Sequence, residues 1–89
     1  MSRYNIYRKE SQSIGGNTKF IETCDNGIEA MHIAIDSMKN DIKNLGTQAE
    51  EIWYEIIDYK YDNDNVVTYK QVKAYMDEDE RLKQNEENF

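Results

Sequence analysis

The stretch "EIWYEIIDYKYDNDNVVTYKQV" (Glu51–Val72) decides the fold, because its pattern fits two strands or two helices. Its first half is rich in Ile, Trp and Tyr, which suit a pleated surface. Strict alternation divides the side chains between two faces, with Ile52, Tyr54 and Ile56 on one and Trp53, Ile57, Tyr59 and Tyr61 on the other. "DNDN" (Asp62–Asn65) predicts the turn, and residues 66–72 the return strand.

The helical alternative rests on the spacing of Ala49, Ile52, Trp53 and Ile56, with Thr47 and Glu50 as a capping box. In this reading residues 48–76 resemble the EF-hand family. Its loop would begin at Lys60 and place Asp62, Asp64 and Thr68 at the third, fifth and ninth positions. The first position is a lysine, Asn65 replaces the glycine, and Gln71 replaces the bidentate glutamate. The resemblance therefore implies a metal-free interaction module, and β propensity favours the hairpin instead.

An earlier hairpin is expected near the N-terminus. Residues 3–9 alternate apolar and polar side chains, and residues 19–24 do the same. In the second of these strands the alternation places Phe20 with Cys24 on one face and Ile21 with Thr23 on the other. "SIGGN" (Ser13–Asn17) supplies the connection between the two strands, because its glycines tolerate positive φ.

A long amphipathic helix is the clearest element of the chain. "DNGIEAMHIAIDSMKNDIKNLG" (residues 25–46) opens with the N-cap Asn26 and closes with Gly46. The predicted buried stripe consists of Ile28, Met31, Ile35, Met38, Ile42 and Leu45. Ile33 lies opposite that stripe, which makes it a candidate contact with a second chain in a homodimer.

These elements predict an α+β fold. The expected layout is a small ββαββ-like domain, in which one amphipathic helix packs on an antiparallel sheet and a short C-terminal helix or tail follows. Residues 1–76 would form the domain, and residues 77–89 an acidic, partly disordered tail.

Charge restricts the partners that are expected. The net charge is −7, and residues 47–89 account for all of it, with twelve acids against five bases. Such a surface repels nucleic acid and anionic lipid, and it favours a basic protein. A lone Cys24 cannot form an internal disulfide, and the chain has no apolar run of membrane-spanning length. The expected compartment is the cytoplasm.

Catalytic and metal-binding constellations are not apparent. His32 is the only histidine and Cys24 the only cysteine, so neither has a second His or Cys to act with. The sequence therefore predicts neither an enzyme nor a cofactor or metal site.

An acidic surface with interleaved aromatic side chains is the feature that points to function. Tyrosine and tryptophan combine a large apolar area with a polar tip, which protein interfaces favour. The candidate partner-binding residues are Trp53, Glu55, Asp58, Tyr59, Tyr61, Asp62, Asp64, Asp77, Glu78, Asp79 and Glu80.

In length, acidity, lack of proline and richness in Asn, Asp, Lys, Ile and Tyr, the chain resembles small accessory proteins of bacteriophages and mobile elements. The resemblance implies a non-enzymatic inhibitor of a basic, nucleic-acid-handling host or defence factor, as anti-CRISPR proteins and DNA mimics are. The alternative is a small-molecule binder, such as a nucleotide sponge. It would hold phosphates with Arg3, Arg8, Lys9 and Lys19 of the first hairpin, with Ile33 as the dimer contact lining the site.

Overall fold

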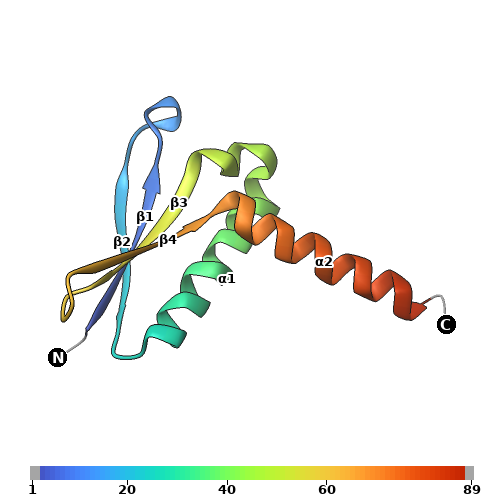
Figure 1. Cartoon of the computed structure of the whole chain (residues 1–89). Coiled ribbons are helices and arrows are strands. Elements are labelled where there is room, and N and C mark those ends of the chain that lie inside the picture. The colour runs from blue at the N-terminus through green and yellow to red at the C-terminus, as the bar shows by residue number, and fades with distance from the viewer. Residues whose placement is uncertain (1–2, 88–89) are drawn as a thin grey trace.

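The computed structural model of the chain describes residues 3–87 (Figure 1). Within these residues the chain forms four strands, two α-helices and two 3-10 turns. Their bounds are β1 (Tyr4–Glu10), η1 (Gln12–Ile14), β2 (Thr18–Cys24), α1 (Gly27–Leu45), η2 (Gly46–Glu51), β3 (Ile52–Asp58), β4 (Asn63–Thr68) and α2 (Tyr69–Glu87).

The strands form one antiparallel sheet in the order β2-β1-β3-β4, and α1 crosses one face of it (Figure 1). The α+β fold predicted from the sequence is therefore confirmed. The helix-pair reading of residues 48–76 is wrong, and with it the EF-hand-like module, because β3 and β4 pair as a hairpin. Only the 3-10 turn η2 keeps a trace of the helical signal before β3 begins.

Alternation along β3 explains why this segment is a strand. Ile52, Tyr54 and Ile56 are buried beneath α1, as predicted, and Ile56 lies beside Ile6 of β1 at the centre of the sheet. A helix would have spread these side chains over more than one face. The two-residue period therefore buries more apolar surface than the helical one.

The β3–β4 turn comes earlier than the sequence predicted. It consists of residues 59–62, because Asp58 already pairs with Asn63 across the two strands. The Asp58 carboxylate accepts a hydrogen bond from the Lys60 backbone N–H at 3.0 Å, which fixes the first bend. Asp62 completes the turn at φ +50°, a left-handed conformation that aspartate tolerates better than most residues. The rest of "DNDN" belongs to β4.

Strand β4 ends at Thr68 because a capping box begins α2 there. The Thr68 backbone N–H donates to Gln71 Oε1 at 3.2 Å, and the Gln71 N–H donates to Thr68 Oγ1 at 3.4 Å. Residues 69–72 are therefore helical, not the end of the return strand. Residues 77–87, expected in a partly disordered tail, continue this helix, and residues 88–89 lie outside the described part.

Helix α1 begins as predicted, but the face that it buries only overlaps the predicted stripe, with which it shares Met38 and Ile42. Asn26 Oδ1 accepts hydrogen bonds from the N–H groups of Ile28 and Glu29 at 2.8 and 3.3 Å. The residues buried against the sheet are Ala30, Ala34, Met38 and Ile42. Ile28, the first residue of the predicted stripe, is 72% exposed.

The placement of Ile33 opposite the buried side was wrong, since its side chain packs against the core. Large apolar residues dominate a periodicity pattern, whereas small residues such as Ala30 and Ala34 contribute little to it even though they are buried. The homodimer contact predicted for Ile33 loses its structural basis.

Helix α2 is held by its first turns only. Val72 is fully buried and Met76 packs against the core cluster. From Asp77 to Gln84 every side chain is exposed, and the helix projects away from the sheet (Figure 1). The C-terminal half of α2 is therefore a solvated arm.

Candidate protein-binding site

One face of the sheet carries no helix. In Figure 1 both α1 and α2 lie on the same side of it. The strand registers place on the opposite side, here called the open face, the residues Asn5, Tyr7, Lys9, Phe20, Trp53, Glu55, Ile57, Asp64, Val66 and Thr68. The two-layer fold therefore leaves half of the sheet surface to solvent.

Phe20 reaches the open face because of a β-bulge. The register between β1 and β2 shifts at Ile6/Tyr7, so that Cys24 pairs with Tyr4 while Phe20 pairs with Tyr7. Cys24 is buried and Phe20 is exposed. The prediction that these two side chains share a face was therefore wrong, since one extra residue reverses the alternation.

Three aromatic side chains gather on one half of the open face. The rings of Tyr7 and Phe20 meet edge to face, with centroids 5.7 Å apart. The hydroxyl groups of Tyr7 and Tyr59 lie 3.4 Å apart, and Asn5 Nδ2 lies within 3.4 Å of both. The hydrogen bond from Tyr59 lowers the pKa of Tyr7 below its ordinary value. These contacts hold a mixed aromatic and polar surface in place.

The charged groups of the open face leave it electronegative. Lys9 Nζ forms an ion pair with Glu55 at 2.9 Å. The pKa of Asp64 is raised, first by partial burial and then by repulsion from Glu55, while the attraction of Lys9 opposes these effects. One lysine therefore does not compensate two carboxylates, and a cation from outside would be attracted here.

A pocket of about 600 Å³ opens where β3, β4, η2 and α2 meet. Its lining is mostly apolar and consists of Glu50, Ile52, Trp53, Val66, Thr68, Tyr69 and Lys70. Trp53, Val66 and Thr68 also belong to the open face, so the pocket lies at one corner of that face. It is here called the Trp53 pocket.

Several predicted partner-binding residues lie on this surface or at its end. Trp53, Glu55 and Asp64 are on the open face, and Tyr59 extends from its edge. Tyr61 and Asp62 are exposed in the β3–β4 turn.

Asp58 does not lie on the predicted partner-binding surface, because its side chain faces inward. The residue is 6% exposed, and Arg3 holds its carboxylate with two hydrogen bonds of 2.9 and 2.8 Å. The Arg3 guanidinium also lies over the rings of Tyr4 and Tyr61, at 4.9 and 4.7 Å from their centroids. Asp58 is therefore a structural residue and is not available to a partner.

The remaining predicted acids are on another surface. Asp77, Glu78, Asp79 and Glu80 belong to the exposed arm of α2, which leads away from the sheet (Figure 1). Two of them already have partners within the helix, since Lys73 bonds Asp77 and Arg81 bonds Glu78, both at 2.6 Å. The single acidic surface expected from the sequence is in fact two separate ones.

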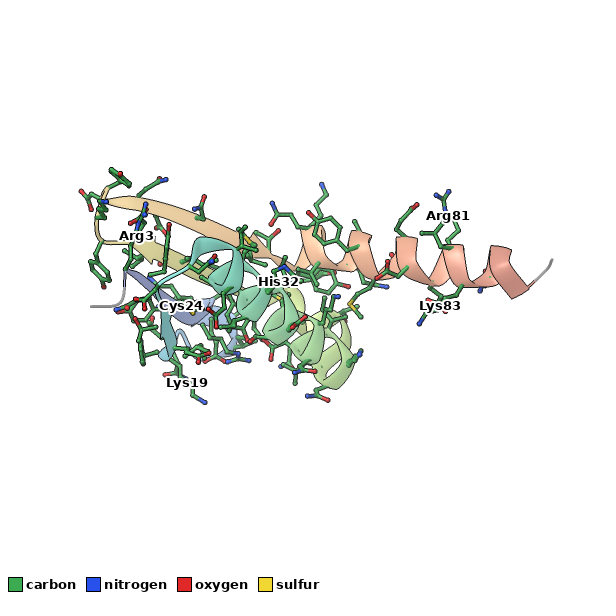
Figure 2. All side chains as sticks on the ribbon, turned by 90° about the horizontal axis from the view of Figure 1, so that it is seen from below. Arg3, Lys19, Cys24, His32, Arg81 and Lys83 are labelled. Carbon is green, nitrogen blue, oxygen red and sulfur yellow. The ribbon has the colours of Figure 1, made fainter. Side chains whose placement is uncertain are left out.

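The four cations proposed to hold phosphate do not form one cluster, although Arg8 and Lys19 are opposite each other in β1 and β2. Arg3 is paired with Asp58, Arg8 with Asp41 at 3.3 Å, and Lys9 with Glu55. Figure 2 shows Lys19 well apart from Arg3. Three of the four positive charges, those of Arg3, Arg8 and Lys9, are therefore paired with carboxylates of the fold, so the geometry does not favour the nucleotide-binding alternative.

Sequence reasoning missed the contribution of the first hairpin and of the residues around the Trp53 pocket. The side chains that neighbour Tyr7 and Phe20 on the open face depend on the order of the strands, and no local sequence pattern reveals this order. Val66, Tyr69 and Lys70 converge on the pocket only because the capping box turns the chain at Thr68.

Other kinds of site find no support among the described residues. No three His, Cys, Asp or Glu side chains between residues 3 and 87 are grouped to hold a metal ion. Cys24 is buried, and burial raises the pKa of its thiol, so the reactive thiolate is disfavoured. Neither described helix is long and apolar enough to cross a bilayer.

No protein-family model, no curated protein and no solved structure matches the chain.

Proposed function

We propose that this protein is a non-enzymatic inhibitor that binds a basic, nucleic-acid-handling protein through the open face of its sheet. The observation that carries the proposal is the one-sided coverage of the sheet. Both helices pack on one side, and the other side presents aromatic and apolar side chains with carboxylates between them (Figure 1).

The size of the open face is sufficient for a specific complex if its margins are used. Four strands of six or seven residues give a surface of about 19 Å by about 23 Å. This is roughly half of the ~800 Å² that each partner buries in a standard interface. A partner would therefore also cover the Trp53 pocket at one corner and the tyrosines at the opposite end. Aromatic anchors at both ends are what a stable complex requires.

The charge of the protein selects the partner. A net charge of −7 attracts basic proteins and accelerates their encounter. On the open face Asp64 and Glu55 repel each other, so an arginine or lysine that approaches them gains more than it would beside a neutral surface. Proteins that handle nucleic acids carry such cations, and blocking them is the activity that the resemblance to phage accessory proteins implies.

The test is affinity capture of host proteins with matched double variants. Phe20→Lys with Tyr59→Lys changes two exposed residues of the open-face side. Ile28→Lys with Leu82→Lys adds the same charge on exposed positions of the two helices. We expect the wild type and the helix variant to retain one basic protein and to inhibit its activity on nucleic acid. The open-face variant should bind at least roughly tenfold more weakly.

Two results would contradict the proposal. One is the recovery of no basic protein by the wild type at low salt. The other is equal binding and inhibition by the open-face variant and the helix variant, which would place the interface elsewhere.

A further inference from the structure

Strand β4 forms an edge of the sheet, and its outward-facing amides are mostly occupied. The Asp64 N–H donates to Asn63 Oδ1 at 3.0 Å, and the Thr68 N–H donates to Gln71 Oε1 at 3.2 Å. In an antiparallel ladder alternate residues direct both backbone groups to the same side. Asp64, Val66 and Thr68 therefore face outward, and Val66 alone keeps both its N–H and its C=O without a side-chain partner among the described residues.

The Trp53 pocket adjoins this one available backbone position. Val66 lines the pocket, is 44% exposed and lies diagonally across from Trp53 in the register of β3 and β4. A volume of about 600 Å³ lies within the ~300–1,000 Å³ of typical ligand pockets. It accommodates a large aromatic side chain, which would meet the rings of Trp53 and Tyr69 in the wall.

Two opposite charges flank the same position along β4. Asp64 lies two residues before Val66 on the open face, and its carboxylate experiences repulsion from Glu55. Lys70 lies beyond Thr68 at the rim of the pocket. Neither Asp64 nor Lys70 forms an ion pair within the described part of the chain. The edge therefore carries a negative group, an apolar hollow and a positive group, in that order.

We propose that β4 and the Trp53 pocket bind a short extended segment of the partner protein, antiparallel to β4. An aromatic residue of this segment exchanges two backbone hydrogen bonds with Val66 and fills the pocket. An arginine or lysine two residues later faces Asp64, and an acid two residues earlier faces Lys70. This inference rests on the proposed function, and it specifies the partner's sequence as acid, any residue, aromatic, any residue, base.

The register follows from the geometry of strand pairing. An antiparallel neighbour places residues directly opposite each other, with their side chains on the same face of the sheet. If the aromatic residue is opposite Val66, the residue two later is opposite Asp64, and the residue two earlier is opposite Thr68, next to Lys70. The occupied amides of Asp64 and Thr68 limit the pairing to this one backbone pair, so the segment is short.

The experiment is a titration of the full chain with capped five-residue peptides, followed by the fluorescence of Trp53, its single tryptophan. The probe is Glu-Thr-Phe-Thr-Arg, and the order control is Arg-Thr-Phe-Thr-Glu. We expect saturable binding of the probe, about fivefold weaker binding of the reversed peptide, and loss of roughly tenfold or more on replacing Phe by Ala. Methylation of the Phe nitrogen should weaken binding about tenfold, whereas methylation of the preceding Thr nitrogen should not.

Exchanging the two charges of the protein tests the register of the peptide, and it separates an effect on the register from an effect on the folding of the protein. Asp64→Lys with Lys70→Glu should invert the preference, so that the reversed peptide becomes the stronger ligand. The inference is overturned if neither peptide gives a saturable change, if the two nitrogen methylations act equally, or if the exchange leaves the order of affinity unchanged.

The outcomes also separate this inference from the proposed function. Phe20→Lys with Tyr59→Lys lies outside the pocket and should leave peptide binding intact while host-protein capture is lost. Capture that persists without any peptide binding would refute only the edge site. Peptide binding without capture of a basic protein would refute the proposed function.

Discussion

The pair of Arg3 and Asp58 fastens the start of β1 to the end of β3. Both guanidinium hydrogen bonds are short, and the carboxylate also accepts the Lys60 N–H that shapes the turn. The hydrogen bonds from Arg3 lower the pKa of Asp58 to about 2, against an ordinary value of 3.8. A carboxyl group whose pKa is depressed by folding stabilises the folded state wherever it is ionised.

The stability of the protein should therefore depend on Asp58 in acid. Its contribution is fully present above pH 3.8 and is lost as the pH falls through about 2. We expect Asp58→Asn to lower the melting temperature at pH 7 and the difference from the wild type to shrink as the pH approaches 2. Asp62→Asn, in the exposed turn, should follow the wild-type profile. A constant difference at all pH values would show that the ionised pair is not the cause.

Tyr54 makes a second polar contact beneath α1. Its hydroxyl donates to Asp41 Oδ2 at 2.6 Å, and Arg8 Nε donates to the same oxygen at 3.3 Å. Tyr54→Phe removes a hydrogen bond to a charged acceptor and should reduce the free energy of unfolding by about 1.5–3 kcal/mol. Urea denaturation measures this, with the exposed Tyr75→Phe as the control. Equal midpoints for the two variants would contradict the role of the contact.

At the scale of the elements, α1 shows where packing differs from periodicity. Ala30 and Ala34 of α1, which carry the smallest side chains of its buried face, are both fully buried. Ala34→Leu should force the helix away from the sheet and cost about 1–3 kcal/mol of stability. Ile28→Ala should change it by less than about 0.5 kcal/mol, since Ile28 is mostly exposed. Chemical denaturation of both variants decides between this face and the stripe that begins at Ile28.

The sequence was sufficient for the identity of most elements but not for their exact faces. The β3 alternation, the N-cap Asn26 and the stop at Gly46 are local signals, and the structure bears them out. The bulge that turns Phe20 outward depends on the pairing of β2 with β1, which is a contact between segments. The early end of β4 has a local cause, because the backbone N–H groups of Thr68 and Gln71 each donate to the side chain of the other, and this capping box prevails over strand propensity.

The candidate site was predictable only in part for the same reason. Trp53 and Glu55 share a face because of a two-residue period, which can be read from the sequence, whereas Asp64 joins them because the turn ends earlier than predicted. Asp58 is an acid, as Glu55 and Asp64 are, but its position in β3 directs its side chain inward, to Arg3. The residues that complete the surface come from β1 and β2, and only the strand order brings them there.

At the scale of the whole molecule, the protein is an elongated body with principal extents of 49, 32 and 16 Å. The side chains of the C-terminal arm, from Asp77 to Gln84, make hydrogen bonds only within α2, from Lys73 to Asp77 and from Arg81 to Glu78. Such a segment contributes little to the cooperative unit, because an isolated helix of that length is marginal in water.

Truncation after Met76 should therefore leave the domain intact. We expect a melting temperature within a few degrees of that of the full chain, since a change below about 0.5 kcal/mol shifts it by only ~2–4 °C in a domain of this size. The helical signal in circular dichroism should fall by the contribution of the arm alone. A truncated chain that fails to fold would show that the arm belongs to the core unit.

The occupied amides of β4 also bear on how the protein behaves when it is concentrated. An open strand edge is a template on which other molecules can add in register and grow into fibrils. Here Asn63 and Gln71 cover two of the three outward amides, while the bulge interrupts the pairing of β2 with β1 at the opposite side of the sheet. The same side chains that confine a ligand to one backbone position thus leave another copy of the protein little free backbone on which to add along β4.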